Sequence, residues 1–215
     1  MFNFFLDIIF PKYCLDCGEE GEYWCEQCRQ KPVRPWLGSF DIYNAYFDDI
    51  IFAGDYEDEI IAALLKNLKY KFAKELAPLA GYLAAKRLEE KIKKKNIFGK
   101  HFFKACIVPV PLSKKRQTWR GFNQADLISQ FVANYFNLKY EPCLMRIKHK
   151  KAQAKLAEHE RLLNMANCFQ LISPAPKRVI LIDDVVTTGA TINECAKVLK
   201  ANGTKEVMVL AVAKG

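Results

Sequence analysis

The sequence predicts an α/β protein in which helices flank a parallel sheet, with a small zinc-binding module at the amino end. Residues 179–182 and 206–213 form apolar strands without polar alternation, so both of their faces should be buried. The segments between such strands carry apolar residues at helical spacing. A chain of 215 residues has room for one main domain, residues 39–215, and a module over residues 1–38.

The first half of the main domain is predicted to contain one hairpin and two helices. Residues 39–56 alternate aromatic and β-branched residues with polar ones, as a small hairpin does. Residues 57–70 and 74–95 have apolar residues three and four positions apart, which predicts a helix for each range.

The second half alternates strands and helices. A short buried strand, residues 105–111, is broken by prolines and leads into a basic loop, residues 113–124. A helix is expected from Gln124 to Phe136, followed by a polar, basic stretch from Arg146 and a helix that ends near Asn167. The strands at the carboxyl end then enclose a helix over residues 191–201.

Positive charge is concentrated in the middle third of the chain. The formal net charge is +9, yet residues 86–155 alone hold eighteen Lys or Arg against four Asp or Glu. Such a block attracts nucleic acid, anionic membrane or a phosphorylated metabolite, although a solvated Lys-rich helix face has the same composition. The hydrophobic content of 51% excludes a disordered protein.

The amino-terminal residues MFNFFLDIIF resemble neither a signal peptide nor a membrane span. They contain no Lys or Arg, and the apolar run is about half of the ~20 residues that cross a bilayer. We therefore expect a cytoplasmic protein. The leader should pack on the main domain, and the alternative is shallow, peripheral contact with the inner membrane.

Four cysteines predict a structural zinc site. Two C-x-x-C pairs are separated by seven residues, and each pair can grip one ion from a tight turn. Gly18 suits the left-handed turn that aims backbone N–H groups at a sulfur. The alternative is a redox dithiol, which a single pair would favour more than two. The expected zinc ligands are Cys14, Cys17, Cys25 and Cys28.

Residues 179–191, VILIDDVVTTGAT, predict a phosphate-binding loop. An apolar strand ends in Asp183 and Asp184, and the following loop opens a helix whose free N–H groups and dipole favour an anion. Gly189 allows close backbone approach, and the Thr hydroxyls can donate hydrogen bonds to phosphate oxygens. The two carboxylates would serve neighbouring hydroxyls or hydrated Mg²⁺, which indicates a sugar phosphate ligand.

This segment resembles the phosphoribosyl-diphosphate (PRPP) loop of type I phosphoribosyltransferases. The resemblance implies that Asp183 and Asp184 are the catalytic carboxylates and contact the ribose of a Mg²⁺–PRPP complex. It also implies a phosphate cradle formed by Val185, Val186, Thr187, Thr188, Gly189, Ala190 and Thr191.

The whole chain resembles the ComF family of competence proteins. The resemblance is carried by the Cys module, Leu68-Lys69-Tyr70, Pro109-Val110-Pro111-Leu112, Arg120-Gly121-Phe122-Asn123-Gln124, and the spaced set Arg146, Gln153, Leu156, Arg161, Asn164 and Phe169. Residues 148–151, KHKK, depart from the family's usual hydroxyl residues. The resemblance implies participation in natural transformation, with single-stranded DNA and helicase-like and recombination-mediator proteins as partners.

Two basic groups are candidate single-strand DNA contacts, because cations follow phosphates while aromatic rings stack on bases. In transferases of this fold, such a region instead holds pyrophosphate. Three functions remain open: DNA handling with a PRPP pocket, an active phosphoribosyltransferase acting on a nucleobase-like acceptor, or an adaptor that docks through the zinc module. The candidate DNA contacts are Lys114, Lys115, Arg116, Trp119, Arg120 and Phe122, together with Lys150 and Lys151.

Overall fold

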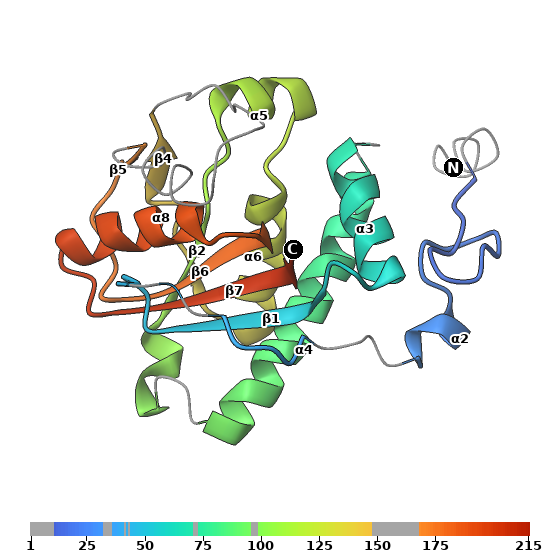
Figure 1. Cartoon of the computed structure of the whole chain (residues 1–215), viewed down its shortest axis with the longest axis horizontal. Coiled ribbons are helices and arrows are strands. Elements are labelled where there is room, and N and C mark those ends of the chain that lie inside the picture. Colours follow the sequence, from blue (N-terminus) through green and yellow to red (C-terminus); the bar gives the residue numbers. More distant parts are fainter. Residues whose placement is uncertain are drawn as a thin grey trace.

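A five-stranded parallel sheet forms the centre of the protein (Figure 1). The computed structural model describes residues 11–31, 36–40, 42, 44–70, 73–95, 99–147 and 168–215. The strand order is β1 (Asp49–Asp55), β7 (Glu206–Lys214), β6 (Arg178–Val186), β2 (Cys106–Pro109) and β3 (Lys139–Tyr140). The described part thus confirms the predicted parallel sheet.

Successive residues of the central strand β6 enter two different apolar cores. Ile180 and Ile182 belong to the core beneath α3, α4 and α6, whereas Val179 and Leu181 belong to the core beneath α8. Side chains of a strand alternate between faces, so an unbroken apolar run is what a sheet with two covered faces requires.

The helices occupy these faces as expected. α4 (Ala77–Lys95) and α6 (Gln124–Phe136) pack on one face with α3 (Glu59–Tyr70) beside them, and α8 (Ala190–Ala201) covers the other (Figure 1). A 3₁₀ turn, Lys74–Leu76, precedes α4, and a second, Gly99–Lys104, precedes β2. The helices predicted over residues 57–70, 74–95, 124–136 and 191–201 are confirmed within one or two residues.

Two predictions for secondary structure were wrong. The described residues between 39 and 56 contain one strand, β1, which pairs in parallel with β7 rather than with a hairpin partner. The expected basic loop is a short helix, α5 (Lys114–Arg120), because Ser113 caps its start by accepting a hydrogen bond from the Arg116 N–H and Gly121 ends it at φ +74°.

A small antiparallel pair was missed. β4 (Leu144–Arg146) pairs with β5 (Phe169–Leu171) beside α8 (Figure 1). The connection between these strands, residues 148–167, lies outside the described residues, as does the leader at residues 1–10. The predictions for Lys150, Lys151 and the helix ending near residue 167 therefore concern parts that the structure does not describe.

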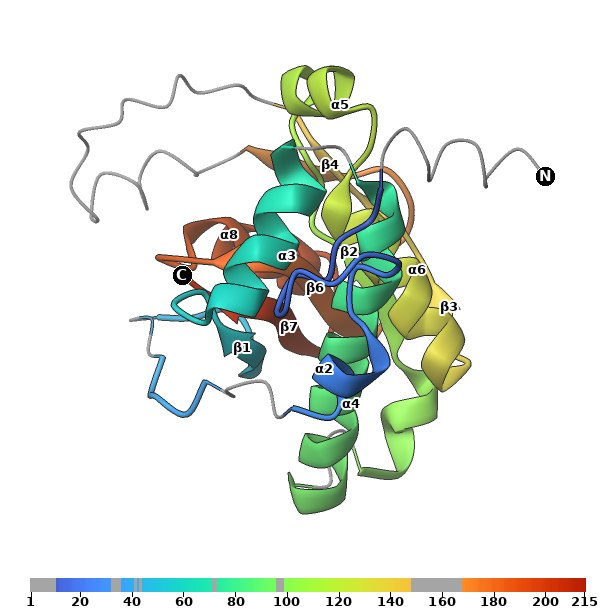
Figure 2. The ribbon, with the colours of Figure 1, turned by 90° about the vertical axis from the view of Figure 1, so that its right-hand side faces the viewer.

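The cysteine module packs against the helical face of the main domain (Figure 2). It contains the one-turn helix α2 (Glu26–Arg29), and its buried Trp24 lies with Leu79 and Leu83 of α4. Among the described helices, none combines the length and the apolar character needed to cross a membrane. The boundary at residue 38 stays a prediction.

Candidate functional site

The four cysteines of the module form a pocket of the right size for a tetrahedral metal ion. All four sulfur atoms lie within 4.8 Å of one another, and the sulfurs of Cys17 and Cys25 are 3.7 Å apart. Zinc–sulfur bonds of about 2.3 Å at tetrahedral angles place sulfurs about 3.8 Å apart. The donor set thus fits zinc, which also prefers thiolates.

Backbone N–H groups of the module stabilise the thiolate form of Cys14. Burial raises the pKa of the Cys14 thiol, but hydrogen bonds from the backbone of Cys17, Cys25 and Asp16 outweigh it and lower the pKa to about 6. Gly18 adopts φ +77°, as predicted, and its N–H donates to the Cys14 carbonyl over 3.0 Å. The turn therefore favours a thiolate even before metal binds.

The predicted phosphate loop lies between β6 and α8, at the carboxyl edge of the sheet. Gly189 is the residue before α8 and has no side chain to cap the helix. The Ala190 N–H donates to the Thr188 Oγ1 over 3.5 Å, and Thr191 and Ile192 of the first turn line a small recess. No acidic residue lies in the first turn of α8. The recess is lined by Asp183, Val185, Val186, Thr187, Thr188, Gly189, Ala190, Thr191 and Ile192.

Gly189 is required here for two reasons. Its φ of +75° disfavours any residue with a Cβ, and an added Cβ would lie 2.1 Å from Cδ1 of Ile42 and 3.1 Å from the Phe40 ring. The sequence predicts that a phosphate can approach the backbone closely at this glycine. One side of it is instead packed by Ile42 and Phe40, so a phosphate has to approach from the recess.

The adjacent carboxylates Asp183 and Asp184 lie near the carboxyl end of β6 and have different partners. The Asp183 Oδ1 accepts a hydrogen bond from the Asp184 N–H over 2.8 Å. The Asp184 Oδ2 lies 3.1 Å from the Lys69 Nζ, and both side chains of this ion pair are about 85% buried, being 13% and 15% exposed. In the sequence, Lys69 contributes only to the family resemblance. The structure brings it next to the carboxylates of the site.

Burial makes Asp183 a weak acid. Burial and, second, the negative charge of Asp184 raise the pKa of this carboxyl to about 8, although the hydrogen bond from the Asp184 N–H and the charges of Lys69 and Arg146 oppose the shift. A group that ionises near neutral pH, in a recess beside a phosphate-type loop, is typical of a functional site.

Two arginines extend the positive charge around the carboxylates. Burial lowers the pKa of Arg120, while the charge of Asp184 raises it. Burial likewise lowers the pKa of Arg146, while Asp183 is among the groups that raise it. Arg116 interacts electrostatically with both arginines, so α5 and β4 bring their cations to one place.

An aromatic cluster lies next to this charge. The Arg120 guanidinium is 5.5 Å from the centre of the Tyr70 ring and 5.9 Å from that of Trp119, and the two ring centres are 6.4 Å apart. Tyr70 and Trp119 are each more than half exposed. We call Tyr70, Trp119 and Arg120 the aromatic platform.

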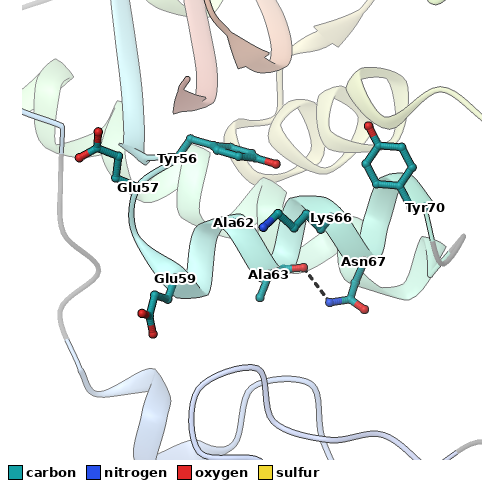
Figure 3. Close-up of a pocket in the computed structure, with 8 residues that line it drawn as sticks. All are labelled: Tyr56, Glu57, Glu59, Ala62, Ala63, Lys66, Asn67 and Tyr70. Atoms are coloured by element: carbon teal, nitrogen blue, oxygen red, sulfur yellow. Dashed lines mark hydrogen bonds between the residues drawn. The ribbon is translucent and has the colours of Figure 1, made fainter.

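A groove follows the outer face of α3 and ends at this platform. It encloses about 590 Å³, and its floor is formed by Ala62 and Ala63. In Figure 3, Tyr56 and Tyr70 lie on the same side of α3 with the Lys66 amine between them, and the carboxylates of Glu57 and Glu59 point away. The groove carries one central cation between two rings.

Comparison with known proteins places the chain in a family. Residues 126–215 match the model of the phosphoribosyl transferase domain. Competence protein F of Haemophilus influenzae is 32% identical over 218 residues, which cover 95% of this chain and 85% of that protein. The chain belongs to the ComF family.

Other members of the family support this placement. DNA utilization protein YhgH of Salmonella typhimurium is 30% identical, over 94% of this chain and 83% of its own length. Competence protein ComFC of Bacillus subtilis is 39% identical over 107 residues, 48% of this chain and 40% of its own. The parallel sheet and the matching domain model establish the phosphoribosyltransferase-type fold of this ComF protein.

One predicted DNA contact of this ComF protein is wrong. Phe122 is only 7% exposed and packs in the core, with the Lys74 Nζ 5.2 Å above its ring. A ring in that position is unavailable to a base. Tyr70, and not Phe122, is the aromatic neighbour of Trp119. The apolar spacing of α3 does not predict this contact, because Tyr70 is the last residue of that helix.

Proposed function

We propose that this ComF protein handles single-stranded DNA during natural transformation and binds Mg²⁺–PRPP, or a similar sugar phosphate, in the recess between β6 and α8. The observation that carries the proposal is the position of the aromatic platform next to Asp184: Arg120 interacts electrostatically with this carboxylate, and Tyr70 follows Lys69, which forms an ion pair with it. The names of the relatives, a competence protein and a DNA utilization protein, agree with it.

The cluster on α5 has the chemistry of a single-strand binding site. Lys114, Lys115 and Arg116 are near the start of the helix, and the exposed Trp119 and Tyr70 rings flank Arg120 at its end. Cations follow the phosphates, and stacking on a ring is worth about 1–3 kcal/mol per base whatever the sequence. The Arg120 Nη1 donates a hydrogen bond to the Gln124 Oε1 over 2.9 Å, which fixes the guanidinium beside the two rings.

The recess has groups suited to each part of a Mg²⁺–PRPP complex. The first N–H groups of α8 and the hydroxyls of Thr187, Thr188 and Thr191 would hold the 5′-phosphate. Asp183 and Asp184 would hold the ribose hydroxyls, and the bound Mg²⁺ would neutralise the diphosphate charge. Helicase-like and recombination-mediator proteins are the proposed partners in the cytoplasm, with peripheral contact to the inner membrane as a further proposal.

The test compares two quadruple variants of equal charge. Replacing Lys114, Lys115, Arg116 and Arg120 by Ala should lower the affinity for a labelled single-stranded oligonucleotide by at least about tenfold at low salt, because each phosphate contact is lost. The matched control replaces Lys93 and Lys94 in the last turns of α4, Lys104 at the end of the 3₁₀ turn before β2, and Lys205 just before β7.

The control variant should bind as the unmodified protein does. Equal losses in both variants would show that only net charge matters, and unchanged affinity in the first variant would refute the proposed site.

The second candidate function is phosphoribosyl transfer to a nucleobase-like acceptor. It is favoured by Asp183, whose raised pKa is typical of catalytic groups. Asp183 and Asp184 would position the ribose while pyrophosphate leaves, and the surrounding cations would stabilise the charge that develops. Pyrophosphate release in the presence of Mg²⁺, PRPP and a panel of bases is the test. Bound PRPP without release would remove this candidate.

A further inference from the structure

The ion pair between Lys69 and Asp184 lies next to the recess, one residue along β6 from Asp183, which lines it. Its 3.1 Å distance and its burial mean that Lys69 neutralises a carboxylate that a divalent cation or a sugar hydroxyl would otherwise contact. A ligand that uses Asp184 has to compete with this internal cation.

Lys69 is connected to the aromatic platform by its position in the chain. Lys69 and Tyr70 are the last two residues of α3, and the first points to Asp184 while the second lies against Arg120 and Trp119. Arg120 also feels the charge of Asp184. A displacement of Lys69 therefore changes the position of Tyr70 and the charge around Arg120.

We propose that Lys69 is a built-in counter-ion that Mg²⁺ with a sugar diphosphate displaces, and that this exchange couples the recess to the aromatic platform. The inference rests on the proposed function and adds its regulation: occupation of one site alters the other. Coupling of this kind is reciprocal, so a ligand on the platform alters the affinity of the recess by the same factor.

The first measurement is the affinity of the zinc-loaded protein for Mn²⁺ alone, by calorimetry. Lys69→Met should bind Mn²⁺ at least about tenfold more tightly than the unmodified protein, because it leaves a buried carboxylate without its partner. Lys69→Arg should behave as the unmodified protein, since it keeps the charge.

Lys66→Met is the matched control. It removes the same charge from the same helix, but Lys66 lies on the outer face, in the groove (Figure 3). Equal Mn²⁺ affinity in Lys69→Met and Lys66→Met would overturn the proposal, because a purely structural Lys69 gives that result.

The second measurement follows the platform in the unmodified protein, which keeps the proposal testable if Lys69→Met does not fold. The fluorescence of Trp119, obtained as the difference from Trp119→Phe, should change when Mg²⁺ and PRPP are added. In Lys69→Met the change should be absent while binding persists. An unchanged Trp119 signal in the unmodified protein with PRPP bound would overturn the coupling.

Both measurements omit DNA. Failure to bind single strands would therefore count against the proposed function alone, whereas failure here with DNA binding intact would count against the coupling alone.

Discussion

Replacing Asp183 by Asn should remove a loss of stability that the protein otherwise suffers as the pH rises. In the unfolded chain this carboxyl ionises near 3.8, whereas in the folded protein burial raises its pKa to about 8. Between these values folding takes up a proton, so the free energy of unfolding falls with rising pH. The contribution is complete below about pH 4 and is lost by about pH 8.

The size of the effect follows from one proton. A full proton corresponds to about 1.4 kcal/mol per pH unit, so between pH 3.8, where the unfolded carboxyl ionises, and pH 7 the loss of stability due to Asp183 is at most about 4.4 kcal/mol. The Asn side chain has nearly the same shape and does not ionise. Asp183→Asn should therefore be more stable than the unmodified protein at pH 7, by up to this amount, and should match it at low pH.

Urea unfolding at several pH values measures this difference. The control is Glu57→Gln, which removes an exposed carboxyl near the end of β1. Identical pH dependence in Asp183→Asn and in the unmodified protein would refute the reasoning. That result would mean that the charges of Lys69 and Arg146 fully cancel the rise in the pKa of Asp183 that burial causes.

Three further outcomes are expected. Purified protein should contain about one zinc ion per chain by mass spectrometry, and Cys28→Ser should lose the ion and lower the melting temperature, because four thiolates hold it; full stability without metal would contradict this. Gly189→Ala should destabilise the protein in thermal unfolding more than Gly203→Ala does, since both have positive φ but the new Cβ would lie 2.1 Å from the Ile42 Cδ1 at Gly189 and at an ordinary contact distance of 3.5 Å from the Lys177 Nζ at Gly203; equal effects would show that φ alone matters. Trp119→Ala should cost about 1–3 kcal/mol of single-strand binding in fluorescence anisotropy, and Tyr70→Ala a similar amount, if each ring stacks on a base; loss from one alone would assign stacking to a single ring.

The sequence alone predicts correctly the elements whose burial follows from the pattern of their own residues. The apolar run of β6 predicts a strand buried on both faces, and the spacing of Leu64, Leu65 and Leu68 predicts the buried face of α3. The cysteine spacing likewise predicts four sulfurs in one pocket, which the structure confirms. These features are local, so no knowledge of the rest of the fold is needed.

The errors concern contacts between distant segments. The segment that contains β1 was predicted to be a hairpin, but β1 is an edge strand of the parallel sheet and its partner β7 is about 160 residues away in the chain. α5 is short and has no buried residue, so only its caps, Ser113 and Gly121, signalled a helix.

The site itself is formed by such distant contacts. Lys69, Arg120 and Arg146 come from three elements and meet Asp183 and Asp184 only after the sheet has formed. Composition placed positive charge in residues 86–155, which include Arg120 and Arg146 but not Lys69, and it did not show which cations face the carboxylates. Phe122 was misassigned for the same reason, since burial is a property of the folded chain.

The most direct test of the central claim is the salt dependence of single-strand binding, with and without Mg²⁺ and PRPP. Four cations on α5 and at its end should release counterions with a slope of about −3 in a plot of log affinity against log salt concentration. The variant with Lys114, Lys115, Arg116 and Arg120 replaced by Ala should lose that slope, and PRPP should shift the affinity of the unmodified protein. A slope that is unchanged in the variant, or no binding at low salt while PRPP is retained, would contradict the account.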